Sequence, residues 1–256
     1  RDVTTNDAAN NYAISASLTR IVGRQTLKVG ADLRRYDFRR ALTVSASGLF
    51  VFAGIFTDNP IADFVLGDVT PVPGSSGFQT AVNSHAYQWY QGYFANDTVQ
   101  FSRKLTMNLG VRWDIPGSYT EADDRNTALL PQLQSPLVLV RSAQYPSRHD
   151  LESHYRLFAP RLGLAYQFGV QTVVRAGYGI NFLPQGVGVA GPSYSPINSA
   201  ETDVPFGGTL SNPLLGSPVL QPIGRNESAL STFIGQSTQS RIPTQSFPYM
   251  QQWNLD

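Results

Sequence analysis

The feature that most constrains this fold is strict alternation over long segments. In residues 105–117, "LTMNLGVRWDIPG", one set of side chains is apolar: Leu105, Met107, Leu109, Val111, Trp113 and Ile115. The residues between them are polar, charged or glycine: Thr106, Asn108, Gly110, Arg112 and Asp114. Because a β-strand repeats every two residues, the two sets point to opposite faces. The segment therefore predicts a strand with one wholly apolar face and one polar face.

Further segments of the same kind lie at 11–21, 26–36, 86–100, 159–168 and 172–182, and another begins near Phe247. Segment 86–100 carries aromatic residues at both odd and even positions, so the face to which each set points stays open. Most strands of globular proteins have about 5–6 residues. These segments are about twice that long, and a tilted strand that crosses a bilayer needs about 9–11 residues.

The connections between these segments alternate in length. Those at Val22–Gln25, Phe101–Lys104 and Gly169–Gln171 are short, whereas those at 37–85, 116–158 and 183–246 are long. In an antiparallel up-and-down meander, alternate connections lie at opposite ends of the sheet, so all short turns share one end. Outer-membrane β-barrels have short periplasmic turns and long extracellular loops. We therefore predict an all-β fold, part of a transmembrane outer-membrane β-barrel that stays open within 1–256, in the bacterial outer membrane.

The composition is compatible with this prediction and excludes other classes. Charged residues make up 14% of the chain and its net charge is +1, so no nucleic-acid partner is predicted. The absence of cysteine excludes disulfides and thiolate metal sites. The chain contains no run of 18 or more apolar residues, so no transmembrane helix is predicted. The chain begins without a signal-peptide pattern and ends within a predicted strand, and we expect it to be a fragment of a longer protein.

The alternation assigns side chains to two media. Those expected to face outer-membrane lipid are Leu27, Val29, Leu33, Leu105, Met107, Leu109, Val111, Leu162, Leu164, Val174 and Ile180. Those expected to line a wet lumen are Lys28, Asp32, Arg34, Asn108, Arg112, Asp114, Arg161 and Arg175. Aromatic rings favour the membrane interfaces, and we place Tyr12, Trp89, Trp113, Tyr166, Phe182 and Trp253 there.

One short helix is predicted inside the first long loop, in "TDNPIADFVLG". Asp58 or Asn59 can cap it, Pro60 suits the first helical position, and Gly67 suits the position after its end. Its apolar face would contain Ile61, Phe64 and Val65, and we expect that face to fold against the barrel rim.

No catalytic motif occurs, so we predict a protein that is not an enzyme and needs no cofactor. Two loop clusters could bind a divalent metal: His149, Asp150, Glu152 and His154, and Glu121, Asp123 and Asp124. Their spacing is loose, which favours solvated loops, and no metal site is predicted. Glycines 110, 163, 177 and 179 lie on the polar face, where barrel curvature and close approach by another backbone explain them equally well.

Several stretches together resemble the barrel of TonB-dependent outer-membrane receptors, most of all the Oar-like branch: "TLKVGADLRRYDF", "NPIADFVLG", "LTMNLGVRWDIPGSYTEADDRN", "APRLGLAYQF", "TVVRAGYGINF" and "FPYMQQWNLD". The resemblance implies import of a scarce extracellular ligand such as a siderophore, glycan or peptide, driven by the TonB complex. It also implies a plug and a TonB-contacting segment upstream of Arg1. The lumen residues would then contact the plug or the ligand.

Two other classes stay open. A passive porin-like channel or an outer-membrane adhesin would have the same strands. A secreted, soluble β-sandwich that binds glycans would bury the apolar face under a second sheet of the same chain and would need no detergent.

Overall fold

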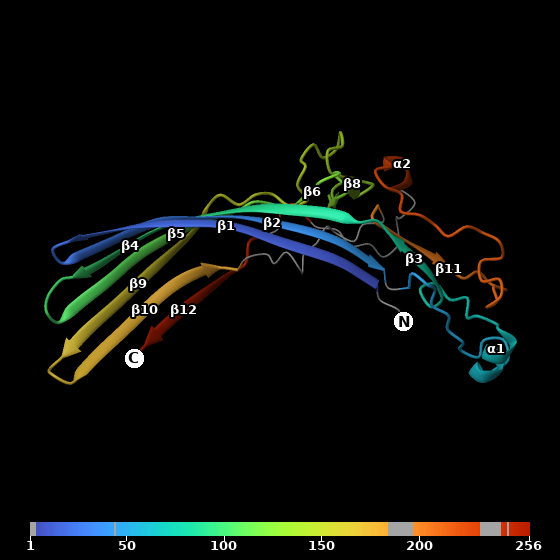
Figure 1. Cartoon of the computed structure of the whole chain (residues 1–256), viewed down its shortest axis with the longest axis horizontal. Coiled ribbons are helices and arrows are strands. Elements are labelled where there is room, and N and C mark those ends of the chain that lie inside the picture. Colours follow the sequence, from blue (N-terminus) through green and yellow to red (C-terminus); the bar gives the residue numbers. More distant parts are fainter. Residues whose placement is uncertain (1–3, 44, 184–196, 231–241, 245) are drawn as a thin grey trace.

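The computed structural model describes residues 4–43, 45–183, 197–230, 242–244 and 246–256. A single curved sheet of long strands runs through the molecule, and the long loops gather at one end of it (Figure 1). Its main strands, in order across the sheet, are β1 (Thr4–Val22), β2 (Gln25–Thr43), β4 (Ser84–Gln100), β5 (Leu105–Pro116), β9 (Leu157–Phe168), β10 (Thr172–Phe182) and β12 (Tyr249–Leu255). All neighbours are antiparallel, which confirms the predicted meander.

Strand boundaries match the prediction near the short turns and differ near the loops. Strand β10 has the predicted bounds, but β1 and β2 extend well beyond 11–21 and 26–36. Their register continues without a break from Val22↔Gln25 to Thr4↔Thr43. Backbone pairing needs no alternation of apolar side chains, so the hydrophobic pattern underestimates the length of this hairpin. The first long loop accordingly starts after Thr43 rather than at residue 37.

The long loops carry structure of their own. Strand β3 (Gly77–Ala81) in the first loop pairs with β11 (Ser199–Asp203) in the third. The second loop contains β6 (Thr120–Glu121), which pairs with β4, and a small hairpin of β7 (Thr127–Leu129) and β8 (Leu137–Leu139). Two helices are present among the described residues, α1 (Pro60–Leu66) and the four-residue α2 (Glu227–Leu230), where one was predicted.

Helix α1 has the predicted caps. The Asn59 side chain accepts hydrogen bonds from the Ile61 amide at 2.9 Å and from the Ala62 amide, and Gly67 ends the helix with a φ of 78°. The expected packing on a barrel rim is wrong, because Ile61, Phe64 and Val65 are exposed and α1 lies beyond β3 and β11, away from the long strands (Figure 1). A buried polar group fixes the helix instead: the Asp63 carboxylate accepts the Thr57 hydroxyl at 2.6 Å.

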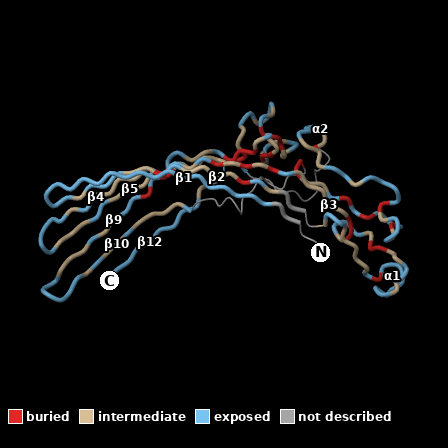
Figure 2. The backbone as a smooth tube through the Cα atoms, in the orientation of Figure 1, coloured by how far each residue is buried: buried red, intermediate tan, exposed pale blue. Residues whose placement is uncertain are grey.

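Buried residues gather mostly towards the loop end of the molecule (Figure 2). One apolar cluster there joins Leu139, Ile197 and Leu230. The turn half of the sheet is a single layer whose apolar face stays open, and Leu109 and Leu162 are each 46% exposed. Among the described residues, no helix has the length and apolar character required to cross a membrane.

The turns are staggered across the sheet. Gln25, the first residue of β2, pairs with Val99, and β4 continues past it towards the next turn. Leu105, the first residue of β5, pairs with Tyr166, and β9 continues to Phe168. Each hairpin thus extends about two residues beyond the previous one. If all turns lie at one membrane surface, a shift of about one residue per strand corresponds to a strand tilt of about 35°, which is the tilt of membrane barrels.

Candidate functional site

The register places every residue predicted to face lipid on one face of the sheet. Leu27 is aligned with Leu109 through Asp97 of β4, and Leu109 is aligned with Leu162. The other members on β2, β5 and β9 lie an even number of residues from these three, and Val174 and Ile180 of β10 share the face because Tyr178 pairs with Leu162. Every predicted lumen residue lies on the opposite face by the same criterion. The pairing fixes which side chains share a face, and the medium that each face meets stays a prediction.

Strand β4, whose phase the sequence left open, is now placed. Trp89 pairs with Arg35 and Tyr93 with Trp113, so both rings lie on the apolar face, while Tyr90 lies on the polar face. Asp97 is the exception to this pattern. It lies on the apolar face, where Gln25 Nε2 donates a hydrogen bond to its carboxylate at 3.1 Å.

Aromatic rings form a row across the apolar face at its loop end. The Trp113 ring lies 5.7 Å from Tyr93 and 5.6 Å from Phe158, on which it stacks. Its indole nitrogen donates to the Tyr155 carbonyl at 2.8 Å. A second aromatic group, Tyr166 with Phe168, lies near the turns.

The separation of the two aromatic groups fits a bilayer. From Phe158 to Phe168 a strand advances about 33 Å, or about 27 Å along the barrel axis at a tilt of about 35°. The apolar band of membrane barrels is about 25 Å tall. The aromatic rows therefore have the spacing of the two membrane interfaces.

The polar face holds a cluster of charged side chains near its loop end. Asp32 and Arg34 of β2 pair at 2.6 Å, and Arg112 and Asp114 of β5 pair at 2.8 Å. Arg112 also reaches Asp32 across β4, at 3.6 Å, over the bare backbone of Gly92. Four of the predicted lumen residues are thus brought together.

Tyr90 of β4 completes this cluster. Its hydroxyl donates to the Asp114 carboxylate and accepts from Arg112 Nη2, the latter at 2.7 Å. The Arg34 guanidinium lies 5.8 Å from the centre of the same ring. Two carboxylates balance two guanidiniums, so the cluster has no net charge and its charged groups are paired. Such a group suits packing against another polar protein surface better than capture of a free ion.

The other predicted lumen residues lie outside the cluster. Asn108 accepts from the Thr98 hydroxyl at 2.6 Å and Arg161 donates to Asn181 at 2.9 Å, while Lys28 and Arg175 are further towards the turns. The polar-face glycines make room for neighbouring side chains. A Cβ on Gly110 would lie 2.2 Å from Asn96, and one on Gly177 would lie 2.3 Å from Asn254.

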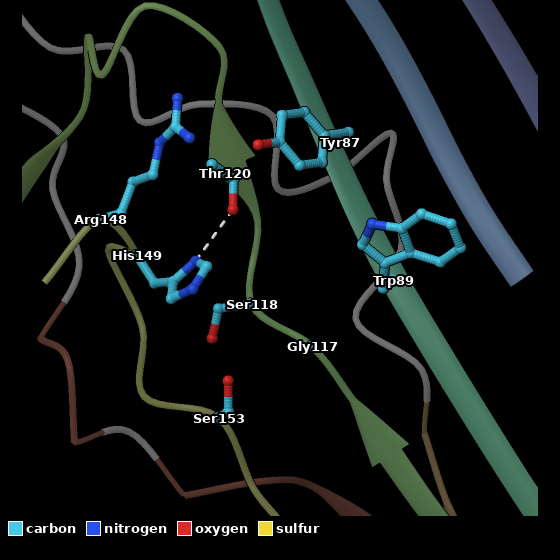
Figure 3. Close-up of a pocket in the computed structure, with 8 residues that line it drawn as sticks. All are labelled: Tyr87, Trp89, Gly117, Ser118, Thr120, Arg148, His149 and Ser153. Atoms are coloured by element: carbon cyan, nitrogen blue, oxygen red, sulfur yellow. Dashed lines mark hydrogen bonds between the residues drawn. The ribbon is translucent and has the colours of Figure 1, made fainter.

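A pocket of about 340 Å³ opens between β4 and the second loop (Figure 3). Tyr87 and Trp89 line one side, and the loop residues Gly117, Ser118, Thr120, Arg148, His149 and Ser153 line the other. The His149 ring is hydrogen-bonded to the Thr120 hydroxyl at 2.9 Å. Since Arg148 is bound to Asp124 and to the Ala122 carbonyl, its guanidinium serves the loop's own structure.

Two of the three acidic loop residues, Glu121 and Asp124, are not the solvated groups that the sequence suggested, whereas Asp123 is exposed. Glu121 is fully buried and accepts hydrogen bonds from the Asp123 and Arg125 amides at 2.9 and 2.7 Å. Asp124 lies between two guanidiniums, at 3.0 Å from Arg141 and 2.5 Å from Arg148. Burial by itself raises the pKa of Asp124, but these two hydrogen bonds outweigh it and hold that pKa below its usual range.

The histidine-rich loop also differs from the prediction. Asp150 is buried, and the His154 ring packs on Phe247 at 5.6 Å, while Glu152 is exposed. In the part of the chain that the structure describes, no group of three or more metal-ligating side chains is found. These loops are held by ion pairs and backbone hydrogen bonds that spacing in the sequence does not reveal.

A comparison with protein families gives the class of the molecule. The chain matches the model of the outer membrane beta barrel domain over residues 2–256. The chain belongs to this outer-membrane β-barrel family. No curated protein and no solved structure matches it.

Membership of the outer-membrane β-barrel family places the protein in the bacterial outer membrane. It agrees with the antiparallel meander and with the aromatic rows on the open face. Tyr90 and Arg35 are the residues of interest that the sequence did not single out. Tyr90 could have been found from Trp89, which the sequence placed at a membrane interface, because the next residue of a strand points to the opposite face.

Proposed function

We propose that this chain is part of the wall of a TonB-dependent transporter, which recognises a scarce extracellular ligand and imports it. The observation that most supports this is the open sheet. Seven long strands lie side by side, yet β1 and β12 form opposite edges and do not pair with each other. Closing this sheet into a barrel requires further strands, and 22-stranded outer-membrane transporters have a plugged lumen.

The polar cluster supports the same proposal. In a barrel whose apolar face meets lipid, Asp32, Arg34, Arg112 and Asp114 point inwards. A balanced, hydrogen-bonded group of this kind offers charged and polar partners to a plug inside the barrel. The role is passage and recognition rather than covalent chemistry, and the long loops contact the ligand first.

Conductance of the complete protein tests this proposal. Reconstituted in a planar bilayer with potassium chloride on both sides, a plugged transporter gives no steady current. Binding of the purified periplasmic domain of TonB to the same protein in detergent is the second measurement. A closed barrel that binds this domain supports the proposal. A steady ohmic current without TonB binding identifies a passive channel, and a closed barrel without TonB binding points to an adhesin.

A further inference from the structure

A groove of about 950 Å³ crosses the apolar face over β1, β2 and β4 at its loop end. Its lining includes Ile14 and Leu33, which pair with each other, and, one row further out, Tyr12, Arg35 and Trp89, which form a second row across the three strands. The groove therefore has an apolar half towards the turns and a polar, aromatic half towards the loops. Tyr12 lies about as far from its own turn as Trp113 does, at the level of the aromatic row.

The polar half carries an arginine held by aromatic rings. The Arg35 guanidinium lies 5.2 Å from the centre of the Tyr87 ring and 5.5 Å from that of Trp89. Stacking of this kind orients a guanidinium while its edge N–H groups remain available for a phosphate oxygen. Arg35 Nε is buried and has no hydrogen-bond acceptor among the described residues, whereas the side chain as a whole is 38% exposed, so a phosphate would meet the outer guanidinium nitrogens.

The carboxylate beside Arg35 belongs to Asp37, and its shorter contact is with His85. Asp37 accepts a hydrogen bond from His85 Nε2 at 2.8 Å, and its contact with Arg35 is longer, at 3.4 Å. Arg39 lies further out on the same face and is exposed, and no ion pair joins it to the described residues. From Arg35 towards the loops, this face of β2 thus carries two arginines, Arg35 and Arg39, and the carboxylate of Asp37, which Arg35 shares with His85.

We infer that this groove binds a phosphate-bearing lipid of the outer leaflet, with Arg35 as the contact for the phosphate. An occupant of both halves must have an apolar chain next to an anionic group. Ile14 is 74% exposed and Leu33 is 40% exposed, and their apolar surface would gain nothing from a soluble anion. The outer-membrane location of the family supplies such a lipid at this depth. This inference rests on that location and not on TonB-dependent transport.

Native mass spectrometry of the complete protein with added lipid A tests the inference. We expect the wild-type protein to retain lipid A and to bind dephosphorylated lipid A less well. The Arg35→Gln change should weaken binding of lipid A about tenfold, the loss of one charge-assisted contact. Arg175→Gln removes the same charge from the other face and should leave binding unchanged. Arg35→Lys keeps the charge and should retain most of the binding.

Three results would overturn the inference. The first is equal binding of lipid A by the wild-type protein and by a folded Arg35→Gln variant. The second is equal binding of the phosphorylated and dephosphorylated lipids, which would leave only an acyl-chain groove. The third is displacement of lipid A by millimolar inorganic phosphate, which would indicate a site for soluble anions. The heat-dependent gel shift of folded barrels shows whether Arg35→Gln has folded. If Arg35→Gln has not folded, binding of lipid A by Arg35→Lys and binding of dephosphorylated lipid A by the wild-type protein still test the inference.

Discussion

At the scale of single residues, two neighbours in β5 test which face meets lipid. Leu109 lies midway between the two aromatic rows on the apolar face, and Asn108 lies on the polar face. Leu109→Arg should destabilise the complete protein by about 2–4 kcal/mol, because arginine is costly at the bilayer midplane. Asn108→Arg should cost much less. Equilibrium unfolding in lipid vesicles measures both, and a larger cost at Asn108 would reverse the two faces.

Asp124 gives the second loop a dependence on pH. The ordinary aspartate pKa is about 3.9, and that of folded Asp124 lies lower because Arg141 and Arg148 donate to it. A carboxylate whose pKa is lowered by folding stabilises the fold above the unfolded pKa. This stabilisation is lost as the pH falls through the folded value.

We therefore expect the second loop to keep its structure from neutral pH down to about pH 5 and to lose it below about pH 4. Amide hydrogen exchange in residues 120–150, corrected for the intrinsic rate, measures this change. Asp124→Asn should loosen the same segment at neutral pH, whereas Asp123→Asn is the control, since the Asp123 side chain is 67% exposed. Equal protection of the loop at pH 7 and pH 3 would contradict the prediction.

At the scale of elements, β3 and β11 tie the first loop to the third. A Cβ on Gly77 would lie 2.3 Å from the Thr202 carbonyl oxygen, a backbone atom that cannot rotate away. Gly77→Ala should therefore separate β3 from β11 at a cost of about 1–3 kcal/mol. Gly179→Ala, where the nearest atom would be 3.6 Å away, is the matched control.

Limited proteolysis of the complete protein in membranes measures the separation. New cleavage in residues 44–83 and 197–230 of Gly77→Ala, with an unchanged pattern for Gly179→Ala, is the expected result. If both variants resist cleavage like the wild-type protein, the pairing of β3 with β11 does not hold the loops together.

At the scale of the whole molecule, the sheet has two unpaired edges and one open apolar face. Neither the outer edge of β1 nor that of β12 pairs with another described strand. Free edges and a large apolar surface promote aggregation. We expect the chain of 1–256, produced alone in detergent, to form aggregates without the heat-dependent gel shift of the complete barrel. A monodisperse, heat-modifiable monomer would contradict this expectation.

The sequence by itself determined the strands near the turns, the end of the sheet that carries the loops, and the face of nearly every side chain. These features follow from the two-residue repeat of a strand, which is a local property of the chain. The caps of α1 are equally local. Among the long strands, the alternation left the faces open where both parities were aromatic, in 86–100, and it missed the part of β1 and β2 that continues without an apolar pattern. It also did not predict the short loop strands β3, β6, β7, β8 and β11.

Tertiary structure decided what depends on residues far apart in the sequence. The contact of Arg112 with Asp32 requires the order β2, β4, β5 and the bare backbone of Gly92 between them. Burial of Glu121 requires β6 to pair with β4, and the groove at Arg35 requires the register of three strands. The pairing register fixes these contacts, because a shift of one residue would send each side chain to the opposite face.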